Sequence, residues 1–348
     1  MKKVVLFTSS LNVGGIERVF LTYAGMLADA GYDITYLVCY DSGTLLNQVP
    51  ANVRLYSLGT NKLRISLLAF ARFIRDNKPD VILCASTATI IVYFAVLLSR
   101  IRVKIITSHH NFLNVDVVSY IDKKVIWKFY NQCSSVIAVS KGIYDLLIKH
   151  RVKEEKIHLI YNPVDIKKIL LLSNEYSERL PDNYILFVGR LSKVKNLPFL
   201  LSAFNNFCMH IPNVPLVIVG DGPEKEDIVG LSKGIDGEIK FVGNVSNPYP
   251  YINKASVIVL SSLSEAFPTV LLESMALGKT IVSTPTQGAL EILEKGKFGY
   301  LSKDFHDAFS FSTLLIHAYK FPLKKDVLIE GCVRYSMDNS LRQLLSLF

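Results

Sequence analysis

Short apolar runs alternate with longer helical segments along the whole of this chain. The runs that we expect to form buried strands include residues 3–8, 103–107, 184–188, 215–219 and 256–260. Strands that alternate with helices pair into parallel sheets, because each helix carries the chain back to begin the next strand in the same direction. A chain of 348 residues is long enough for about two such domains. The sequence therefore predicts an α/β protein with two parallel-sheet domains.

A proline-containing segment marks the expected boundary between these domains. Asn162-Pro163-Val164-Asp165 follows the apolar run 157–160, and proline disfavours helix in the residue before it, which suits a linker. We expect a first domain at residues 1–165, a second at 166–330 and a terminal segment at 331–348. Residues 336–348 have the pattern of an amphipathic helix.

The segment 262–273 carries the strongest functional signal. It follows the predicted strand 256–260, and Pro268 stands near the first position of a predicted helix. The first turn of a helix has unpaired backbone N–H groups, where partial positive charge gathers and phosphate commonly binds. The residues expected to offer this turn to a ligand are Phe267, Pro268, Thr269, Val270 and Leu271.

Two glutamates flank this helix start. Glu265 lies in the loop before it, and Glu273 lies four residues after Thr269 on the same helix face. A sugar nucleotide would fit, with its diphosphate on the amides, its sugar hydroxyls on Glu265 and its ribose on Glu273. Taken alone, two glutamates at this spacing are more often ordinary solvated charges, so the interpretation depends on the other segments.

Two further strand ends carry ligand-type residues. Residues 184–188 run into Gly189-Arg190, with Lys195 five residues further on, and these cations resemble a phosphate clamp. Residues 215–219 end in a turn that contains Gly220 and Gly222. Ligands of open α/β sheets bind at the carboxyl ends of the strands. A solvated basic loop is the alternative for the first of these segments.

The first domain offers a glycine pair and a histidine. Gly14 and Gly15 precede a predicted helix at residues 16–30, and they lack the glycine spacing of a dinucleotide site. A plain tight turn is the alternative. His109 and His110 follow the predicted strand 103–107, without further metal ligands nearby in the sequence.

These motifs, taken in chain order, resemble those of the retaining family 4 glycosyltransferases of GT-B fold, of the type that builds bacterial surface polysaccharides. The resemblance covers nearly the whole chain, and its most specific part is the pair Glu265 and Glu273 with seven residues between them. It implies two Rossmann-like domains whose parallel sheets face each other across a cleft, with an N-terminal acceptor domain and a C-terminal nucleotide-sugar domain. It also implies that the last helix returns to the first domain.

The resemblance implies a role for each matching residue of the second domain. Arg190 and Lys195 would hold the donor diphosphate, Glu265 would contact the donor sugar, and Glu273 would bind the ribose. Asn196 departs from the family, which commonly has glycine after the lysine.

In the first domain, the pair Gly14 and Gly15 would face the diphosphate, and His110, which matches better than His109, would reach the donor sugar and the reaction centre. Ala266 is a second departure, because the family often has glycine there. Both departures bear on which sugar is transferred.

The expected activity is therefore that of a metal-independent hexosyltransferase without a cofactor. It would move a sugar from UDP-hexose or UDP-N-acetylhexosamine to a glycan hydroxyl, with retention, in lipopolysaccharide or capsule synthesis. No Asp-x-Asp metal motif occurs in the chain. The alternatives are a UDP-sugar epimerase or hydrolase on the same fold, and a non-catalytic partner of a membrane glycosyltransferase.

The excess positive charge lies in the first half. Residues 1–170 hold 22 Lys and Arg against 12 Asp and Glu, whereas residues 171–348 hold 17 against 18. Such charge favours a lipid-linked acceptor at the inner face of an anionic membrane, and no nucleic-acid module is present. An ordinary solvated face is the alternative. The cations expected on amphipathic helices are Arg64, Arg72, Arg75, Lys123, Lys124 and Lys128.

The remaining features favour a cytoplasmic protein. Five scattered cysteines suit a reducing compartment, and the start of the chain has no apolar signal segment. The longest apolar stretch, residues 88–98, is about half of what a bilayer requires. We expect it to form a buried helix.

Overall fold

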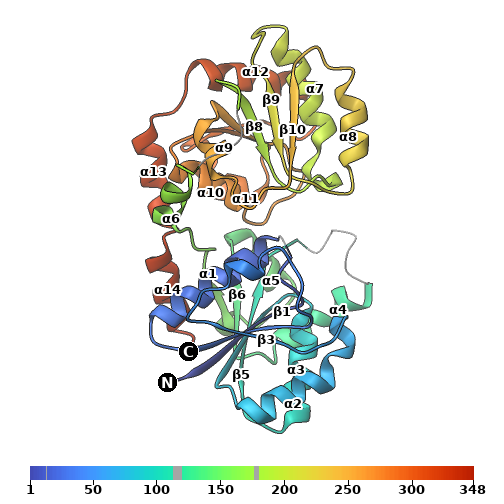
Figure 1. Ribbon diagram of the computed structural model, residues 1–348, viewed down its shortest axis with the longest axis vertical. Coiled ribbons are helices and arrows are strands. Elements are labelled where there is room, and N and C mark those ends of the chain that lie inside the picture. Colours follow the sequence, from blue (N-terminus) through green and yellow to red (C-terminus); the bar gives the residue numbers. More distant parts are fainter. Residues whose placement is uncertain (13, 113–119, 176–179) are drawn as a thin grey trace. The chain divides into compact units, whose positions relative to one another are not determined.

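The computed structural model describes residues 1–12, 14–112, 120–175 and 180–348. The chain divides into two compact units (Figure 1). The N-terminal unit comprises Met1–Pro163 and Met337–Phe348, and the C-terminal unit comprises Val164–Ser336. The prediction of an α/β fold with two parallel-sheet, Rossmann-like domains is confirmed.

The N-terminal unit, in its described part, has a seven-stranded parallel sheet of order β3-β2-β1-β4-β5-β6-β7. Its strands are β1 (Lys3–Thr8), β2 (Asp33–Val38), β3 (Arg54–Ser57), β4 (Val81–Ala85), β5 (Lys104–His109), β6 (Ser135–Ala138) and β7 (Ile157–Leu159). The strand order reverses beside β1, which is the switch point where open α/β sheets bind ligands.

Helices pack against this sheet. The α-helices are α1 (Gly15–Asp29), α2 (Leu67–Asn77), α3 (Ala88–Ser99), α4 (Tyr120–Tyr130), α5 (Lys141–Lys149) and α14 (Met337–Leu345). The described residues of this unit also form the short 3₁₀ turns η1 (Leu46–Gln48), η2 (Leu63–Ile65) and η3 (Glu154–Lys156). The terminal helix α14 packs against α1, and Ser340 Oγ donates to the Tyr161 carbonyl at 3.0 Å, so the last helix is part of the N-terminal unit.

The expectation that residues 88–98 form a buried helix is only half right. Residues Ala88–Ser99 do form α3, which lies between α2 and α4 (Figure 1). One side of α3 packs on the sheet through Val92 and Ala95, but Phe94, Leu97 and Leu98 are exposed, Leu97 to 62%. A helix in the outer layer buries only one stripe, whereas this sequence is apolar all round. Among the described residues, no helix is both long and apolar enough to cross a bilayer.

The C-terminal unit, as described, contains a six-stranded parallel sheet of order β10-β9-β8-β11-β12-β13. Its strands are β8 (Ile185–Val188), β9 (Leu216–Val219), β10 (Ile239–Gly243), β11 (Val257–Leu260), β12 (Thr280–Ser283) and β13 (Tyr300–Leu301). The predicted ligand segments follow β8, β9 and β11. Because these strands are neighbours, their carboxyl ends lie at one edge of the sheet.

Eight α-helices surround this sheet in the described residues. They are α6 (Ile166–Leu172), α7 (Leu197–Cys208), α8 (Lys225–Ser232), α9 (Tyr249–Lys254), α10 (Thr269–Ala276), α11 (Gln287–Ile292), α12 (Ala308–Lys320) and α13 (Lys325–Val333). The 3₁₀ turns η4 (Lys193–Lys195) and η5 (Glu294–Gly296) complete the unit.

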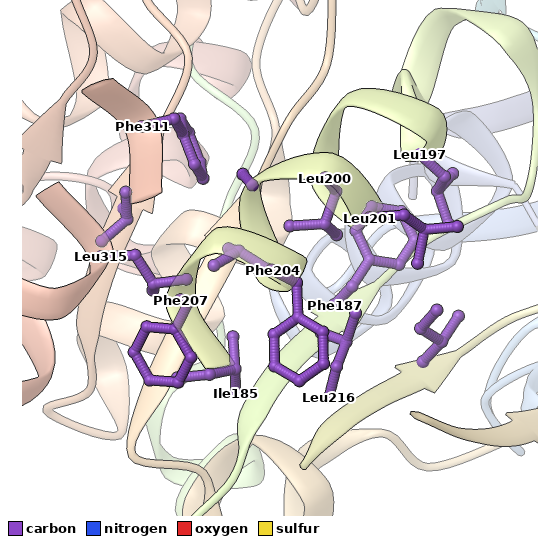
Figure 2. Close-up of a cluster of buried hydrophobic side chains, with 14 of the residues drawn as sticks. Ile185, Phe187, Leu197, Leu200, Leu201, Phe204, Phe207, Leu216, Phe311 and Leu315 are labelled. Carbon is purple, nitrogen blue, oxygen red and sulfur yellow. The ribbon is translucent and has the colours of Figure 1, made fainter. Parts of the chain in front are cut away.

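A large apolar cluster fixes β8 in the middle of this sheet (Figure 2). Phe204 and Phe207 of α7 pack with Phe187 of β8 and with Phe311 and Leu315 of α12, and all five are fully buried. Each such side chain contributes about 1.5–3 kcal/mol by leaving water. The loop that follows β8, which carries Arg190 and Lys195, therefore begins from a rigid support.

Candidate active site

The start of α10 has two open amides, meaning backbone N–H groups that are available to a ligand. Pro268 is the N-cap residue, and the Leu271 N–H already donates to the Pro268 carbonyl at 3.1 Å. In the described part of the chain, no group accepts a hydrogen bond from the N–H of Thr269 or Val270. The side chains of Phe267 and Leu271 are buried and anchor this turn. The backbone of Thr269 and Val270 is therefore available to an anion, at the positive end of the helix dipole.

Lys195 and Glu265 form an ion pair that the sequence did not predict. The Lys195 Nζ lies 2.5 Å from Glu265 Oε1, and the two side chains are only 19% and 15% exposed. Lys195 ends η4, after β8, and Glu265 lies in the loop between β11 and α10. The neighbouring strands β8 and β11 bring together these residues, which are 70 positions apart.

Arg190 is the second cation at the carboxyl edge of this sheet. It follows Gly189 at the end of β8, and its side chain is exposed. Among the described residues, no carboxylate lies within ion-pair distance of its guanidinium. Arg190 is thus available to a ligand, whereas Lys195 is held by Glu265.

Gly220 and Gly222 are required by the packing of the protein's own backbone. Gly220 has φ of 143°, and a Cβ there would overlap the carbonyl oxygen of Gly189. A Cβ at Gly222 would likewise overlap the carbonyl oxygen of Leu191. The loops after β8 and β9 are therefore packed backbone to backbone. The contact of these glycines with a ligand remains a prediction.

Glu273 and Asn196 complete this edge. Glu273 lies one turn after Thr269 on α10 and is half-buried. Asn196 has φ of 51° and ψ of 46°, the left-handed region that glycine and asparagine adopt most readily. This conformation explains why asparagine can stand where the resembled family has glycine.

In the N-terminal unit, His110 follows β5 and is 8% exposed. Its Nε2 lies 2.8 Å from Ser108 Oγ, and its ring packs near that of Phe20. Burial, with neighbouring His109 as a smaller cause, lowers the pKa of His110 to about 3. The ring is therefore neutral at physiological pH and suited to hydrogen bonding with a sugar hydroxyl.

His109 is also buried, but it faces another group of residues. Its Nδ1 lies 2.8 Å from the Tyr130 hydroxyl, and its ring packs near Trp127. No described group pairs with its Nε2. Burial lowers the pKa of His109 to about 4.

The low pKa of His110 predicts a pH-dependent stability. Below pH about 6.5 the unfolded chain gains a proton that the folded chain does not, so the folded state loses stability as pH falls. Between pH 7 and 5 we expect His110 to account for a loss of about 2 kcal/mol in the free energy of unfolding. Urea unfolding of wild type and of His110→Gln at pH 7 and pH 5 measures this loss of stability. Between these pH values His110→Gln should lose less stability than wild type. His210→Gln, at an exposed histidine, is the control and should lose as much as wild type. Equal losses in wild type and His110→Gln would contradict the role given to His110.

The glycine pair lies at the start of α1, next to the carboxylate of Glu17. Gly14 is the N-cap residue, and Gly15 is the exposed first residue of the helix. The Glu17 side chain folds back over Gly14, and a Cβ added at Gly14 would overlap Oε2 of Glu17. Burial raises the pKa of the Glu17 carboxyl, partly offset by a hydrogen bond with its own backbone N–H. A glutamate at the third helical position is a capping signal that could have identified this residue.

Ser261 and Ser262 are further site residues that sequence reasoning missed. Ser262 Oγ donates to Glu265 Oε1 at 2.7 Å, and Ser261 Oγ donates to the Lys195 carbonyl at 2.7 Å. Within the described residues, no three His, Cys, Asp or Glu side chains are grouped so as to hold a metal ion.

Comparison with known proteins places both halves of the chain in glycosyltransferase families. Residues 13–168 match the model of Glycosyltransferase Family 4, and residues 171–330 match that of glycosyl transferases group 1. An uncharacterized glycosyltransferase of Haemophilus influenzae is 27% identical over 316 residues, which cover 86% of each chain.

A second relative comes from Campylobacter jejuni, the GalNAc-alpha-(1->4)-GalNAc-alpha-(1->3)-diNAcBac-PP-undecaprenol alpha-1,4-N-acetyl-D-galactosaminyltransferase. It is 26% identical over 322 residues, covering 86% of this chain and 84% of the relative. Among solved structures, Anabaena Alr3699/HepE in complex with UDP and glucose aligns with a TM-score of 0.81, at 20% identity and 99% coverage of both chains. The chain therefore contains a Glycosyltransferase Family 4 domain followed by a glycosyl transferases group 1 domain, in a GT-B fold.

Proposed function

We propose that this protein transfers a hexose or N-acetylhexosamine from its UDP conjugate to a hydroxyl of a glycan carried on a polyprenyl diphosphate, with retention of anomeric configuration. The observation that carries the proposal is the group of residues at the carboxyl ends of β8 and β11. There Lys195, exposed Arg190 and the open amides of Thr269 and Val270 gather on neighbouring strand ends. A diphosphate is the ligand that suits this combination.

The chemistry follows from the charge that the leaving group acquires. When the bond between the anomeric carbon and the diphosphate oxygen breaks, negative charge grows on UDP. Cations and amides fixed beforehand stabilise that charge as it develops, which is usually the largest catalytic contribution. Arg190, Lys195 and the start of α10 would do so without a metal ion. The acceptor hydroxyl attacks the anomeric carbon from the face that UDP leaves, and its proton passes to a diphosphate oxygen.

The remaining site residues would hold the donor in place. Glu265 would take the donor sugar hydroxyls and Glu273 the ribose, while neutral His110 would orient the sugar. Gly14 and Gly15 would approach the diphosphate from the N-terminal unit. Each role is part of the proposal and can be tested by substitution.

The relatives support the donor and the acceptor. The Anabaena structure was solved with UDP and glucose, and the Campylobacter relative is named for a glycan on a PP-undecaprenol carrier. Both are features of those proteins, and they make UDP-sugars and polyprenyl-linked glycans the first ligands to test with this chain.

The test is a transfer assay with the full chain, UDP-sugars and a polyprenyl-linked glycan. Product that forms only when donor and acceptor are both present supports the proposal. A changed UDP-sugar in the absence of acceptor would indicate the epimerase or hydrolase alternative, and failure to bind any nucleotide would favour a non-catalytic partner. The anomeric coupling in the proton NMR spectrum of the product distinguishes retention from inversion.

We also propose that the N-terminal unit docks on the cytoplasmic face of an anionic membrane. Leu68 is 74% exposed on α2, and Arg72 and Arg75 follow it on the same helix face. The neighbouring helix α3 exposes Phe94, Leu97 and Leu98. Apolar side chains beside arginines suit the headgroup region of anionic lipids, and such a surface would bring the site to a lipid-linked acceptor.

Substituting this surface should weaken membrane binding. The pair Arg72→Gln and Arg75→Gln is expected to lower partitioning onto phosphatidylglycerol vesicles by at least about tenfold, since each cation contributes about 1 kcal/mol. Leu68→Gln should weaken it further by removing an apolar contact. Leu171→Gln, at a leucine of the C-terminal unit that is 72% exposed, is the matched control. Cosedimentation measures partitioning, and arginine variants that bind like wild type would contradict the proposed surface.

A further inference from the structure

Two consecutive buried serines follow β11, and each holds one member of the ion pair. Ser261 and Ser262 have no exposed surface. The Ser261 hydroxyl donates to the Lys195 carbonyl at 2.7 Å, so it fixes the backbone of the turn that carries the lysine. The Ser262 hydroxyl donates to Glu265 Oε1 at 2.7 Å, so it fixes the side chain of the glutamate.

The backbone of this loop is already held at other points. The Leu263 N–H donates to the Val194 carbonyl at 2.8 Å, and the Gly288 N–H donates to the Glu265 carbonyl at 3.0 Å. The Thr284 hydroxyl donates to the Ser262 carbonyl at 2.6 Å. With the backbone fixed in this way, the hydroxyl of Ser262 acts mainly on the orientation of the Glu265 carboxylate.

The two oxygens of that carboxylate are used differently. Oε1 receives both the Lys195 ammonium, at 2.5 Å, and the Ser262 hydroxyl. Oε2 has no hydrogen-bond partner among the described residues. One oxygen is thus bound by the protein, and the other is left for a ligand.

We infer that Ser262 is a positioning residue, which holds Glu265 so that Oε2 is presented to a hydroxyl of the donor sugar. The inference rests on the proposed function, because it requires a sugar at this edge. If Lys195 turned toward the diphosphate of an arriving donor, Glu265 would lose its charged partner. Ser262 would remain as a neutral donor to Oε1, so that the carboxylate would keep its orientation without competing for the diphosphate.

The first test compares Ser262→Ala with Ser264→Ala. Ser264 lies in the same loop and has no hydrogen bond with any described residue, which makes it a matched control. We expect Ser262→Ala to lower kcat by about tenfold, the scale of one lost hydrogen bond to a charged group. The dissociation constant of UDP should stay close to wild type, and the lost buried hydrogen bond should lower the unfolding temperature by only a few degrees. Ser264→Ala should behave as wild type throughout.

Two further variants keep the test decisive if alanine impairs folding. Ser262→Thr retains the hydroxyl and should recover most of kcat. Ser262→Cys keeps a similar side-chain volume with a weaker donor, so it should lower kcat in the same direction as alanine. Thr and Cys variants with equal kcat would overturn the inference.

A double-mutant cycle tests whether Ser262 acts through Glu265. In a Glu265→Ala background there is no carboxylate to orient, so adding Ser262→Ala should change kcat by less than about twofold. A full tenfold effect in that background would show that the serine acts elsewhere and would overturn the inference. A wild-type chain without sugar transfer would overturn the proposed function as well. An active wild type with an unaffected Ser262→Ala variant would overturn this inference alone.

Discussion

Replacing Lys195 by alanine is expected to lower turnover by about 10²–10³, the scale of removing one preorganised donor from a site where charge develops. The lysine would stabilise the departing diphosphate, and its loss also leaves Glu265 without its charged partner at 2.5 Å. Arg190→Ala should have an effect of the same order through the leaving group alone. Steady-state rates with saturating donor and the true acceptor measure both effects.

Lys193 provides the matched control for this experiment. It lies in the same turn, η4, its side chain is exposed, and no described carboxylate pairs with it. Lys193→Ala removes the same charge from the same segment and should leave turnover within about twofold of wild type. Near-normal rates in Lys195→Ala and Arg190→Ala together would mean that the diphosphate is held elsewhere.

Gly220→Ala is expected to destabilise the C-terminal unit by about 3 kcal/mol or more, because the new Cβ would overlap the Gly189 carbonyl oxygen at a backbone conformation that favours glycine. The overlap is with backbone, so no side-chain rotation relieves it. Circular dichroism during urea unfolding follows the whole chain. Fluorescence of Trp127, the only tryptophan, follows the N-terminal unit and should change much less.

Gly230→Ala is the matched control for this prediction. Gly230 lies inside α8, and an added Cβ there would meet nothing within 4 Å. Alanine should stabilise this helix by about 0.5–1 kcal/mol. If instead Gly220→Ala folds with wild-type stability and only weakens UDP binding, the glycine is kept for the ligand and not for packing.

The sequence predicted the strands that lead to the candidate site residues well, because each is a short apolar run that ends at glycine or a polar residue. The expected strand 256–260 and the observed β11, Val257–Leu260, differ by one residue. Patterns along the chain did less well for α3, whose apolar residues gave no sign of which side would face outward.

Contacts between distant segments could not be predicted from such patterns. Lys195 and Glu265 were both expected at the site, but each was assigned to the ligand and neither to the other. Their pairing depends on β8 and β11 being neighbours, which follows from the strand order of the folded sheet. The overlap that requires glycine at position 220 likewise depends on β8 lying beside β9.

Calorimetric titration of the wild-type chain with UDP and with uridine tests most directly whether a diphosphate binds at the carboxyl edge of the second sheet. Both ligands carry the base and the ribose, and only UDP carries the groups that Arg190, Lys195 and the amides of α10 would hold. UDP should bind at least about tenfold more tightly than uridine, since each charge-assisted contact adds to the binding free energy. Equal affinities, or no binding of UDP, would contradict the account.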